Sequence, residues 1–327
     1  MGSRLIVQAS KRGDTSLKAS VTNASLIAEE RITVLVIGSG GREHALCYAL
    51  NRSPSCDAVL CAPGNAGIAQ SGDATCISDL DISDSVAVIA FCRKMGVGMV
   101  VVGPEAPLVT GLVNDLVKAE IPTFGPSSKA AALEGSKDFM KKLCDKYNIP
   151  TAQYRTFTDP VEAKQYVKDQ GAPIVVKADG LAAGKGVVVA MSLDEAFEAI
   201  DSMLVQGSFG SAGSRVLMMR LESDLAQVLL SACRGELGDV SLTWSPEMAM
   251  VVVMASQGYP GSYKKGTVIR NINKAEQVSP AVKIFHAGTA LDGDGNLVAV
   301  GGRVLGITAK GKDIEEARER AYDAVEV

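Results

Sequence analysis

The sequence has 327 residues, of which 47% are hydrophobic and 21% are charged, and its formal net charge is −4. This length is sufficient for two or three domains with cores of their own. The mild acidic balance argues against nucleic acid as a partner, and no apolar run reaches the roughly 18 residues that span a bilayer, so we expect neither nucleic acid nor a membrane as a partner.

The N-terminal segment, residues 1–31, differs in composition from the rest. Its first part is rich in serine and basic residues and contains the single acid Asp14. A basic, serine-rich and acid-poor segment is typical of an organelle transit peptide, and a disordered tail fits the composition equally well. We expect a plastid (chloroplast) location, with the mitochondrion or the cytoplasm as alternatives.

From Ile32 onward, apolar strands alternate with amphipathic helices. The pattern predicts a strand over 32–37, a glycine turn over 38–41 and a helix after it, and strand and turn recur at "AVLCAPG" and "GMVVVGPEAPL". Such alternation indicates an α/β fold with a doubly wound parallel sheet, which binds ligands at the carboxyl ends of its strands.

The middle of the chain begins near Gly135. It reads as a helix, a strand over 153–157, a second helix and two strands around "ADGLAAGKG", followed by a helix over 193–206. "LMMRLESDLAQVLLSACRGE" is predicted to be one helix. The remainder, from "EMAMVVVMAS" onward, is predicted to be β-rich and to close with a helix at "IEEARERAYDAVEV".

The turn "GSGGREH" invites a dinucleotide interpretation, but the sixth position of that motif requires glycine and here is Glu43. A nicotinamide cofactor is therefore not expected. A glycine turn at a helix N-terminus suits a phosphate, and a tight structural turn is the alternative. His44 alone is interpreted as a satisfied histidine at a helix start rather than as a catalyst.

Two further glycine turns, "APGNAG" and "GPEAPL", follow the next two strands. Three polar turns at one sheet edge predict a binding site better than any one of them does. Glu105 in the third turn can accept hydrogen bonds from hydroxyls or an amine.

The lysines indicate an anion-binding site, and the cysteines indicate no metal site. Lys177 ends a strand of valines and isoleucine, where a charge is costly unless it meets an anion such as a nucleotide phosphate. Lys137 could instead belong to a polar helix face. The P-loop motif is absent. Seven scattered cysteines and two histidines predict reduced, mostly buried thiols and no zinc site.

Eight blocks of the sequence together resemble the phosphoribosylamine-glycine ligase family, also called glycinamide ribonucleotide synthetase, of ATP-grasp enzymes. In chain order they are "GSGGREHAL", "PGNAG", "GPEAPL", "FGPSSKAAALEGSKDFMK", "VVKADGLAAGKGVVV", "GYPGSYKKG", "FHAGT" and "GGRVLGITA". The resemblance covers nearly all of residues 32–327, and eight ordered blocks are far more specific than one glycine motif.

The resemblance implies ATP-dependent ligation of glycine to 5-phosphoribosylamine, giving glycinamide ribonucleotide, ADP and phosphate, with Mg²⁺ or Mn²⁺. The residues implied near the phosphoribosyl group are Gly40, Gly41, Arg42 and Asn65, to which we add Glu105. Those implied for ATP are Lys137 and Lys177 at the phosphates and Gly184, Lys185 and Gly186 in a flexible cover.

The chain departs from the family pattern between Val216 and Leu217. The family there carries an adenine-binding strand resembling "EEFLxGEE", a loop "GPNTGGMG" and a metal-binding strand "EFNxRFGDPE", and none of these occurs here. The family's last strand, beyond Val327, is also missing. Glu222 and Asp224 are the nearest acids after the junction, but they fall on a predicted helix and lack the Glu-x-Asn spacing, so we assign no metal ligand.

We expect four regions: residues 1–31, a phosphoribosyl-binding α/β domain over 32–134, a truncated ATP-grasp domain over 135–216, and a helix with a β-rich domain over 217–327. We expect a monomer. Two alternatives stay open: a non-catalytic truncated variant that at most binds the sugar phosphate, and another ATP-grasp carboxylate-amine ligase.

Overall fold

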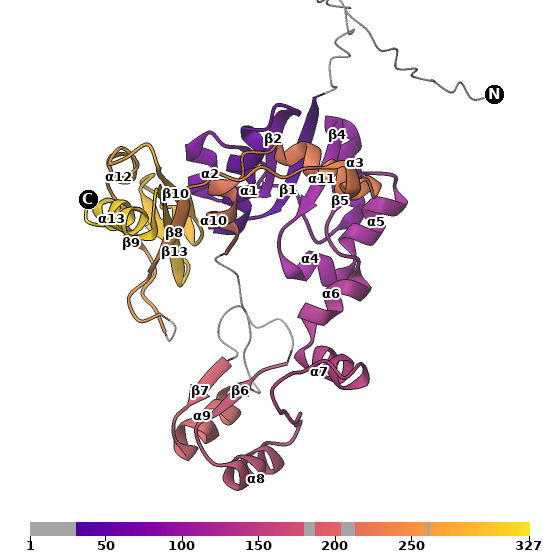
Figure 1. The fold of residues 1–327 in the computed structure, drawn as a ribbon, viewed down its shortest axis with the longest axis vertical. Coiled ribbons are helices and arrows are strands. Elements are labelled where there is room, and N and C mark those ends of the chain that lie inside the picture. The colour runs from indigo at the N-terminus through magenta and orange to yellow at the C-terminus, as the bar shows by residue number, and fades with distance from the viewer. Residues whose placement is uncertain (1–30, 180–186, 204–212, 260–261) are drawn as a thin grey trace, which may run out of the picture. The chain divides into compact units, whose positions relative to one another are not determined.

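The structure is a computed structural model that describes residues 31–179, 187–203, 213–259 and 262–327 (Figure 1). Its first sheet is parallel, with strand order β3-β2-β1-β4-β5. The strands are β1 Ile32–Gly38, β2 Cys56–Pro63, β3 Thr75–Cys76, β4 Val97–Val102 and β5 Thr123–Phe124. The helices of this region are α1 Gly41–Asn51, α2 Ala66–Ser71, α3 Ser85–Met95, α4 Glu105–Thr110, α5 Leu112–Lys118 and α6 Ser128–Gly135. The predicted doubly wound α/β fold is confirmed here.

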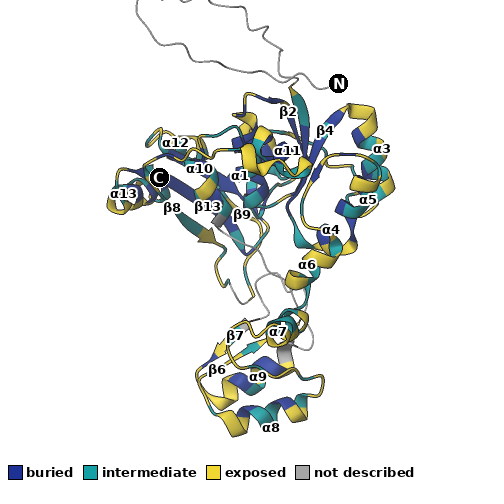
Figure 2. Cartoon of the chain, turned by 45° about the vertical axis from the view of Figure 1, so that its right-hand side comes forward, coloured by how far each residue is buried: buried dark blue, intermediate teal, exposed yellow. Residues whose placement is uncertain are grey.

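Both faces of this sheet are covered by hydrophobic clusters. Side chains of a strand point alternately to the two faces, so neighbouring residues of β1 belong to different clusters. Val34 and Val36 of β1 pack into one hydrophobic cluster, and Leu35 and Ile37 pack into another on the opposite face. The central strands are accordingly mostly buried: in β2 this holds for Val59 to Ala62, and in β4 for every residue except Gly98 (Figure 2). A continuous apolar strand, as β1 was predicted to be, is the pattern that such a position requires.

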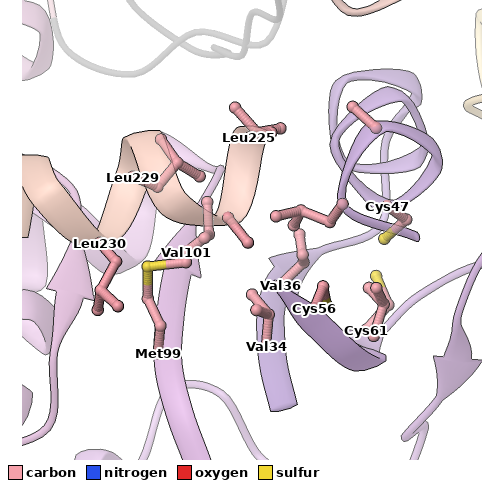
Figure 3. Close-up of a cluster of buried hydrophobic side chains, with 14 of the residues drawn as sticks. Val34, Val36, Cys47, Cys56, Cys61, Met99, Val101, Leu225, Leu229 and Leu230 are labelled. Atoms are coloured by element: carbon pink, nitrogen blue, oxygen red, sulfur yellow. The ribbon is translucent and has the colours of Figure 1, made fainter. Parts of the chain in front are cut away.

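A helix from much later in the chain completes one of these faces. α11, Leu225–Arg234, contributes Leu225, Leu229 and Leu230 to the cluster of Val34 and Val36 (Figure 3). Its start is held by Asp224, whose carboxylate accepts hydrogen bonds from Gln227 N at 3.1 Å and from Ser55 N at 2.8 Å. The core on one face of the first sheet is therefore completed by a segment more than 100 residues later in the chain.

The middle region has two helices before a pair of strands and one after it: α7 Lys137–Lys146, α8 Pro160–Gln170, β6 Ile174–Lys177, β7 Val187–Ala190 and α9 Leu193–Met203. β6 and β7 pair in antiparallel fashion. The strand predicted over 153–157 is wrong, since these residues are neither helix nor strand. "QYRTF" has the β-branched and aromatic composition of a strand, but no strand of the described residues pairs with it.

The predicted single helix after residue 216 is also wrong. Two helices occur, α10 Gly213–Arg220 and α11, and the chain between them forms a bridge from Leu221 to Trp244. Asp224 caps α11, and this local hydrogen bonding competes with continuing a helix. A short 3₁₀ helix, Leu237–Asp239, follows.

The C-terminal region contains two antiparallel three-stranded sheets, ordered β10-β13-β8 and β11-β12-β9. Its elements are β8 Met248–Ala255, β9 Thr267–Val268, α12 Ile272–Glu276, β10 Val282–His286, β11 Thr289–Leu291, β12 Leu297–Ala299, β13 Arg303–Gly311 and α13 Ile314–Val325. α13 packs on β13 and β8, and the apolar residues of β10 and β13 form a separate core with Ala321 and Ala324. The β-rich prediction for this part is confirmed.

Candidate functional site

Three loops meet at the carboxyl edge of the parallel sheet. They follow β1, β2 and β4, and β1 lies between the other two strands. Backbone hydrogen bonds join them, from Gly64 N to Gly38 O and from Gly103 N to Ile37 O, both at 3.1 Å. β2 and β4 lie on opposite sides of β1, so the edge between β1 and β4 is the point at which the strand order reverses and at which open α/β sheets bind ligands.

Glu43 occupies the space between two of these loops. Its side chain is buried; one carboxylate oxygen accepts a hydrogen bond from Gly40 N and the other from Arg42 Nε, each at 2.7 Å. A Cβ on Gly38, whose φ is +131°, would stand 2.5 Å from Glu43 Cγ, and one on Gly103 would also overlap this side chain. Glu43, which departs from the dinucleotide motif, thus packs against the loops after β1 and β4.

Arg42 is fixed at the edge by two carboxylates. Its Nη1 donates to Glu105 Oε1 at 3.0 Å, in addition to the Nε bond to Glu43. Burial acts to lower the pKa of Arg42, but the two carboxylates outweigh it and raise the pKa, so the guanidinium stays charged. The side chain keeps 23% exposure, which leaves part of it open to a ligand. Glu105, expected to accept from a hydroxyl or an amine, accepts from Arg42.

Asn65 links the second loop to its surroundings. As the N-cap of α2, it accepts a hydrogen bond from Ile68 N at 2.9 Å. Its amide nitrogen donates to Ser39 O at 2.7 Å and to His286 O at 3.2 Å, the latter at the end of β10. The structure therefore brings Gly40, Gly41, Arg42, Asn65 and Glu105 to one edge.

Beneath this edge lies a buried polar cluster. His44 Nδ1 accepts from His286 N at 2.9 Å, so its Nε2 carries the proton and donates to Asp73 Oδ2 at 3.2 Å. Lys283 Nζ also reaches that carboxylate oxygen, at 3.2 Å. His44 is fully buried and has a partner at each nitrogen, which confirms it as a satisfied histidine.

This cluster predicts that stability falls in mild acid. Burial lowers the pKa of His44 despite Asp73, and burial, His44 and Lys283 lower the pKa of His286 to about 3. The ordinary pKa of both is 6.5, so the unfolded chain binds more protons below that pH. Their contribution to stability is thus present above pH 6.5 and is lost as the pH falls toward 3.

The measurement is the melting temperature between about pH 7.5 and pH 5, for the wild type and for His286→Asn. We expect a smaller acid-induced loss in the variant, because one of the two buried groups that resist protonation is gone. Parallel pH profiles for the two proteins would contradict the assignment of His286.

The lysines implied for ATP lie in the middle region. Lys137 is half-buried and is the first residue of α7, and Asp179, just after β6, accepts hydrogen bonds from Ser136 Oγ and from Asp138 N at 3.1 Å. The chain around Lys137 is thus tied to the segment that follows Lys177. Lys177 ends β6 as predicted, but it is exposed, so the expectation that burial forces it onto an anion is wrong. Gly184, Lys185 and Gly186 lie outside the described residues.

The described residues show no cluster of metal-ligating side chains. They contain no group of three or more His, Cys, Asp or Glu side chains that could hold a metal ion. Asp224 and Glu222 lie between α10 and α11 and not on a helix as predicted. Asp224 is engaged by Ser55 N and Gln227 N, and Glu222 is exposed.

All seven cysteines are free, and four of them are buried.

Two site residues were not predicted from the sequence. Glu43 was noted only as a departure from a motif, although its spacing of three residues from Gly40 is that of a capping box. Arg215 of α10 lies against Gly41, and no local sequence signal indicates this contact.

Among the described residues, no helix combines the length and apolar character needed to cross a membrane.

Three family models match this chain. They are described as phosphoribosylglycinamide synthetase N domain (residues 32–134), ATP-grasp (A) domain (residues 135–229) and C domain (residues 249–327). The chain is 54% identical to a chloroplastic phosphoribosylamine-glycine ligase of Arabidopsis thaliana, over 92% of this chain and 81% of that protein. It is 40% identical to the phosphoribosylamine-glycine ligase of Rhizobium meliloti, over 89% and 94% of the respective lengths.

The crystal structure of a Thermotoga maritima phosphoribosylamine-glycine ligase has the same fold, with a TM-score of 0.57 at 24% identity, over 90% of this chain and 96% of that one. The alignment with the Arabidopsis thaliana relative extends over 429 residues, more than the 327 of this chain. The relative therefore contains residues with no counterpart here, as a missing internal block requires.

Proposed function

The chain belongs to the phosphoribosylglycinamide synthetase (phosphoribosylamine-glycine ligase) family, and we propose that it retains that family's phosphoribosyl-binding edge but not the means to transfer a phosphoryl group. The family's reaction is the ATP-dependent ligation of glycine to phosphoribosylamine, a step of purine biosynthesis. The substrates glycine, phosphoribosylamine and ATP follow from this membership.

The observation that carries the proposal is the edge itself. The guanidinium of Arg42, held by Glu43 and Glu105, lies beside a glycine loop at the start of α1. The Glu43 carboxylate takes the hydrogen bond of Gly40 N, and the other amides at the start of α1, next to an arginine, favour a phosphate. Glu105, whose Oε1 accepts from Arg42, would also accept a hydrogen bond from a ribose hydroxyl. Both polar atoms of the Asn65 side chain are already engaged within the protein, so Asn65 would position its loop.

The phosphoryl-transfer half is less complete. A transferring γ-phosphoryl group requires Mg²⁺ at its oxygens, and Mg²⁺ requires carboxylate ligands. The described residues contain no group of three or more side chains that could hold a metal ion, and Asp224, one of the two nearest acids after the junction, is already hydrogen-bonded. The adenine-binding and metal-binding strands implied by the family are absent between Val216 and Leu217. We derive no catalytic step for this chain through a metal.

Finer assignments belong to the same proposal. Lys137 and Lys177 would contact ATP phosphates, and the N-terminal domain would end near residue 134. The plastid would receive the protein, as the chloroplastic name of the Arabidopsis thaliana relative and the basic first residues suggest. The protein would act as a monomer, without nucleic-acid or membrane partners.

Replacing Arg42 with Ala tests the phosphoribosyl assignment. We expect the affinity for ribose 5-phosphate, measured by isothermal titration calorimetry, to fall roughly tenfold or more, because a charge-assisted hydrogen bond to phosphate is lost. Arg93→Ala is the control, since Arg93 is an exposed arginine of α3. Equal affinities of the Arg42 variant and the wild type for ribose 5-phosphate would contradict the assignment and would leave Arg42 with a structural role only.

A further inference from the structure

Arg215 is a buried cation beside the glycine loop. It lies on α10, which packs against α1, β8 and β13, and only 4% of it is exposed. Its guanidinium passes between two glycines: a Cβ on Gly41 would stand 2.5 Å from Arg215 Nε, and one on Gly306 would stand 2.6 Å from Arg215 Cδ. Both neighbours are open to it only because they lack side chains.

The described residues leave part of this guanidinium without a partner. Among them, none accepts a hydrogen bond from Arg215 Nε, and none forms an ion pair with Arg215. The adjacent carboxylate of Glu43 has both oxygens engaged, by Gly40 N and by Arg42. A buried charge without a partner is costly, and arginine presents a fork of donors suited to an oxyanion.

The electrostatics at this point are positive. Burial lowers the pKa of Arg215, Arg303 of β13 lowers it further, and Glu43 only opposes this. The two carboxylates near the loop, Glu43 and Glu105, are both paired with Arg42. The N-terminus of the 11-residue helix α1 adds its own partial positive charge. Glu43 accepts a hydrogen bond from Gly40 N alone among the amides of that first turn.

We infer that Arg215 and the N-terminus of α1 at Gly40 and Gly41 form a phosphate subsite, which takes the phosphate monoester of a phosphoribosyl ligand. The identification of the ligand as a phosphoribosyl compound rests on the proposed function. The inference that the subsite binds an anion rests on Arg215 and the helix N-terminus alone. Arg215 stands next to the Val216 to Leu217 junction, so the subsite includes a residue of the segment in which this chain departs from the family pattern.

Calorimetric titration of the full chain with inorganic phosphate and with ribose 5-phosphate tests the inference. We expect Arg215→Gln to weaken both by roughly tenfold or more and Arg215→Lys to weaken them less, because lysine keeps the charge but loses the fork. The control is Arg220→Gln. Arg220 lies on the same helix, and its Nε likewise has no partner in the part of the chain that the structure describes, but its Nη2 donates to Ser245 O at 3.0 Å.

The outcomes separate the two proposals. Loss of binding in Arg215→Gln but not in Arg220→Gln supports the subsite. Arg215-dependent binding of inorganic phosphate without binding of ribose 5-phosphate supports the subsite and contradicts the phosphoribosyl function. Binding of ribose 5-phosphate that depends on Arg42 but not on Arg215 overturns the subsite alone.

A melting experiment covers the case in which Arg215→Gln does not fold. A bound ligand raises the melting temperature of the state that binds it. Saturating phosphate is expected to raise that of the wild type and of Arg220→Gln, and to raise that of Arg215→Lys less. An equal rise in all three, or none in the wild type, overturns the inference.

Discussion

No detectable glycinamide ribonucleotide is expected when the purified chain is incubated with ATP, glycine, Mg²⁺ and phosphoribosylamine. The transferring phosphoryl group develops negative charge that a metal clamp stabilises by several kcal/mol, which amounts to orders of magnitude in rate. The metal-binding strand implied by the family is absent between Val216 and Leu217, and the described residues contain no group of three or more side chains that could hold a metal ion. The reaction is followed as product formation and as glycine-dependent phosphate release.

The matched control restores the missing block. A version that carries, between Val216 and Leu217, the Arabidopsis thaliana residues without a counterpart in this chain is expected to form product. Phosphate release by the original chain at the rate of the restored version would contradict the prediction. Glu222→Gln would then be the next variant, because Asp224 is engaged by Ser55 N and Gln227 N, whereas Glu222 is exposed.

Replacing Leu229 with Ala is expected to cost roughly 2–5 kcal/mol in the free energy of unfolding. Leu229 is 6% exposed and lies on α11 in the cluster that contains Met99 and Val101 of β4 (Figure 3). The substitution removes buried apolar contact and leaves a cavity between the helix and the sheet. Urea unfolding followed by circular dichroism measures the effect as a lower midpoint.

Leu237→Ala is the matched control for that experiment. Leu237 is 53% exposed, so the same chemical change should alter stability by about 0.5 kcal/mol or less. If the two variants unfold at the same urea concentration, α11 does not complete the core of the first sheet. In that event the first region would be stable without the part of the chain that follows the junction.

The parallel sheet was predictable because its strands carry their own signal. β1 is apolar at each of Val34 to Ile37, and Gly38 to Gly41 mark its end. The strand predicted over 153–157 had the right composition but lacks a described partner. Pairing depends on residues distant in the chain, and a local pattern contains no information about them.

The break between α10 and α11 illustrates the same limit. Leu221 and Trp244 form a bridge, and Asp224 caps α11 while bonding to Ser55, 169 positions earlier. The apolar spacing from Leu217 to Arg234 fits one helix as well as two. The tertiary contacts decide between them.

The site was predictable in part for a topological reason. Loops after adjacent parallel strands must meet at one edge, so Arg42, Asn65 and Glu105 could be grouped from the sequence. The spacing of Glu43 from Gly40 indicates only its capping role. The contacts of Glu43 with Gly103 and of Arg215 with Gly41 could not be predicted, because they depend on close approach in space. Lys177 was assigned by an argument from burial, and its exposure removes that argument.

Hydrogen exchange with ribose 5-phosphate tests the central claim, retention of the phosphoribosyl-binding edge, most directly. A bound sugar phosphate would slow exchange of the amides that its site orders. We predict protection in residues 38–42 and 63–67, the loops after β1 and β2, at saturating ligand. Protection confined to residues 177–190, with the two loops unchanged, would contradict the account and would assign the ligand to the region implied for ATP.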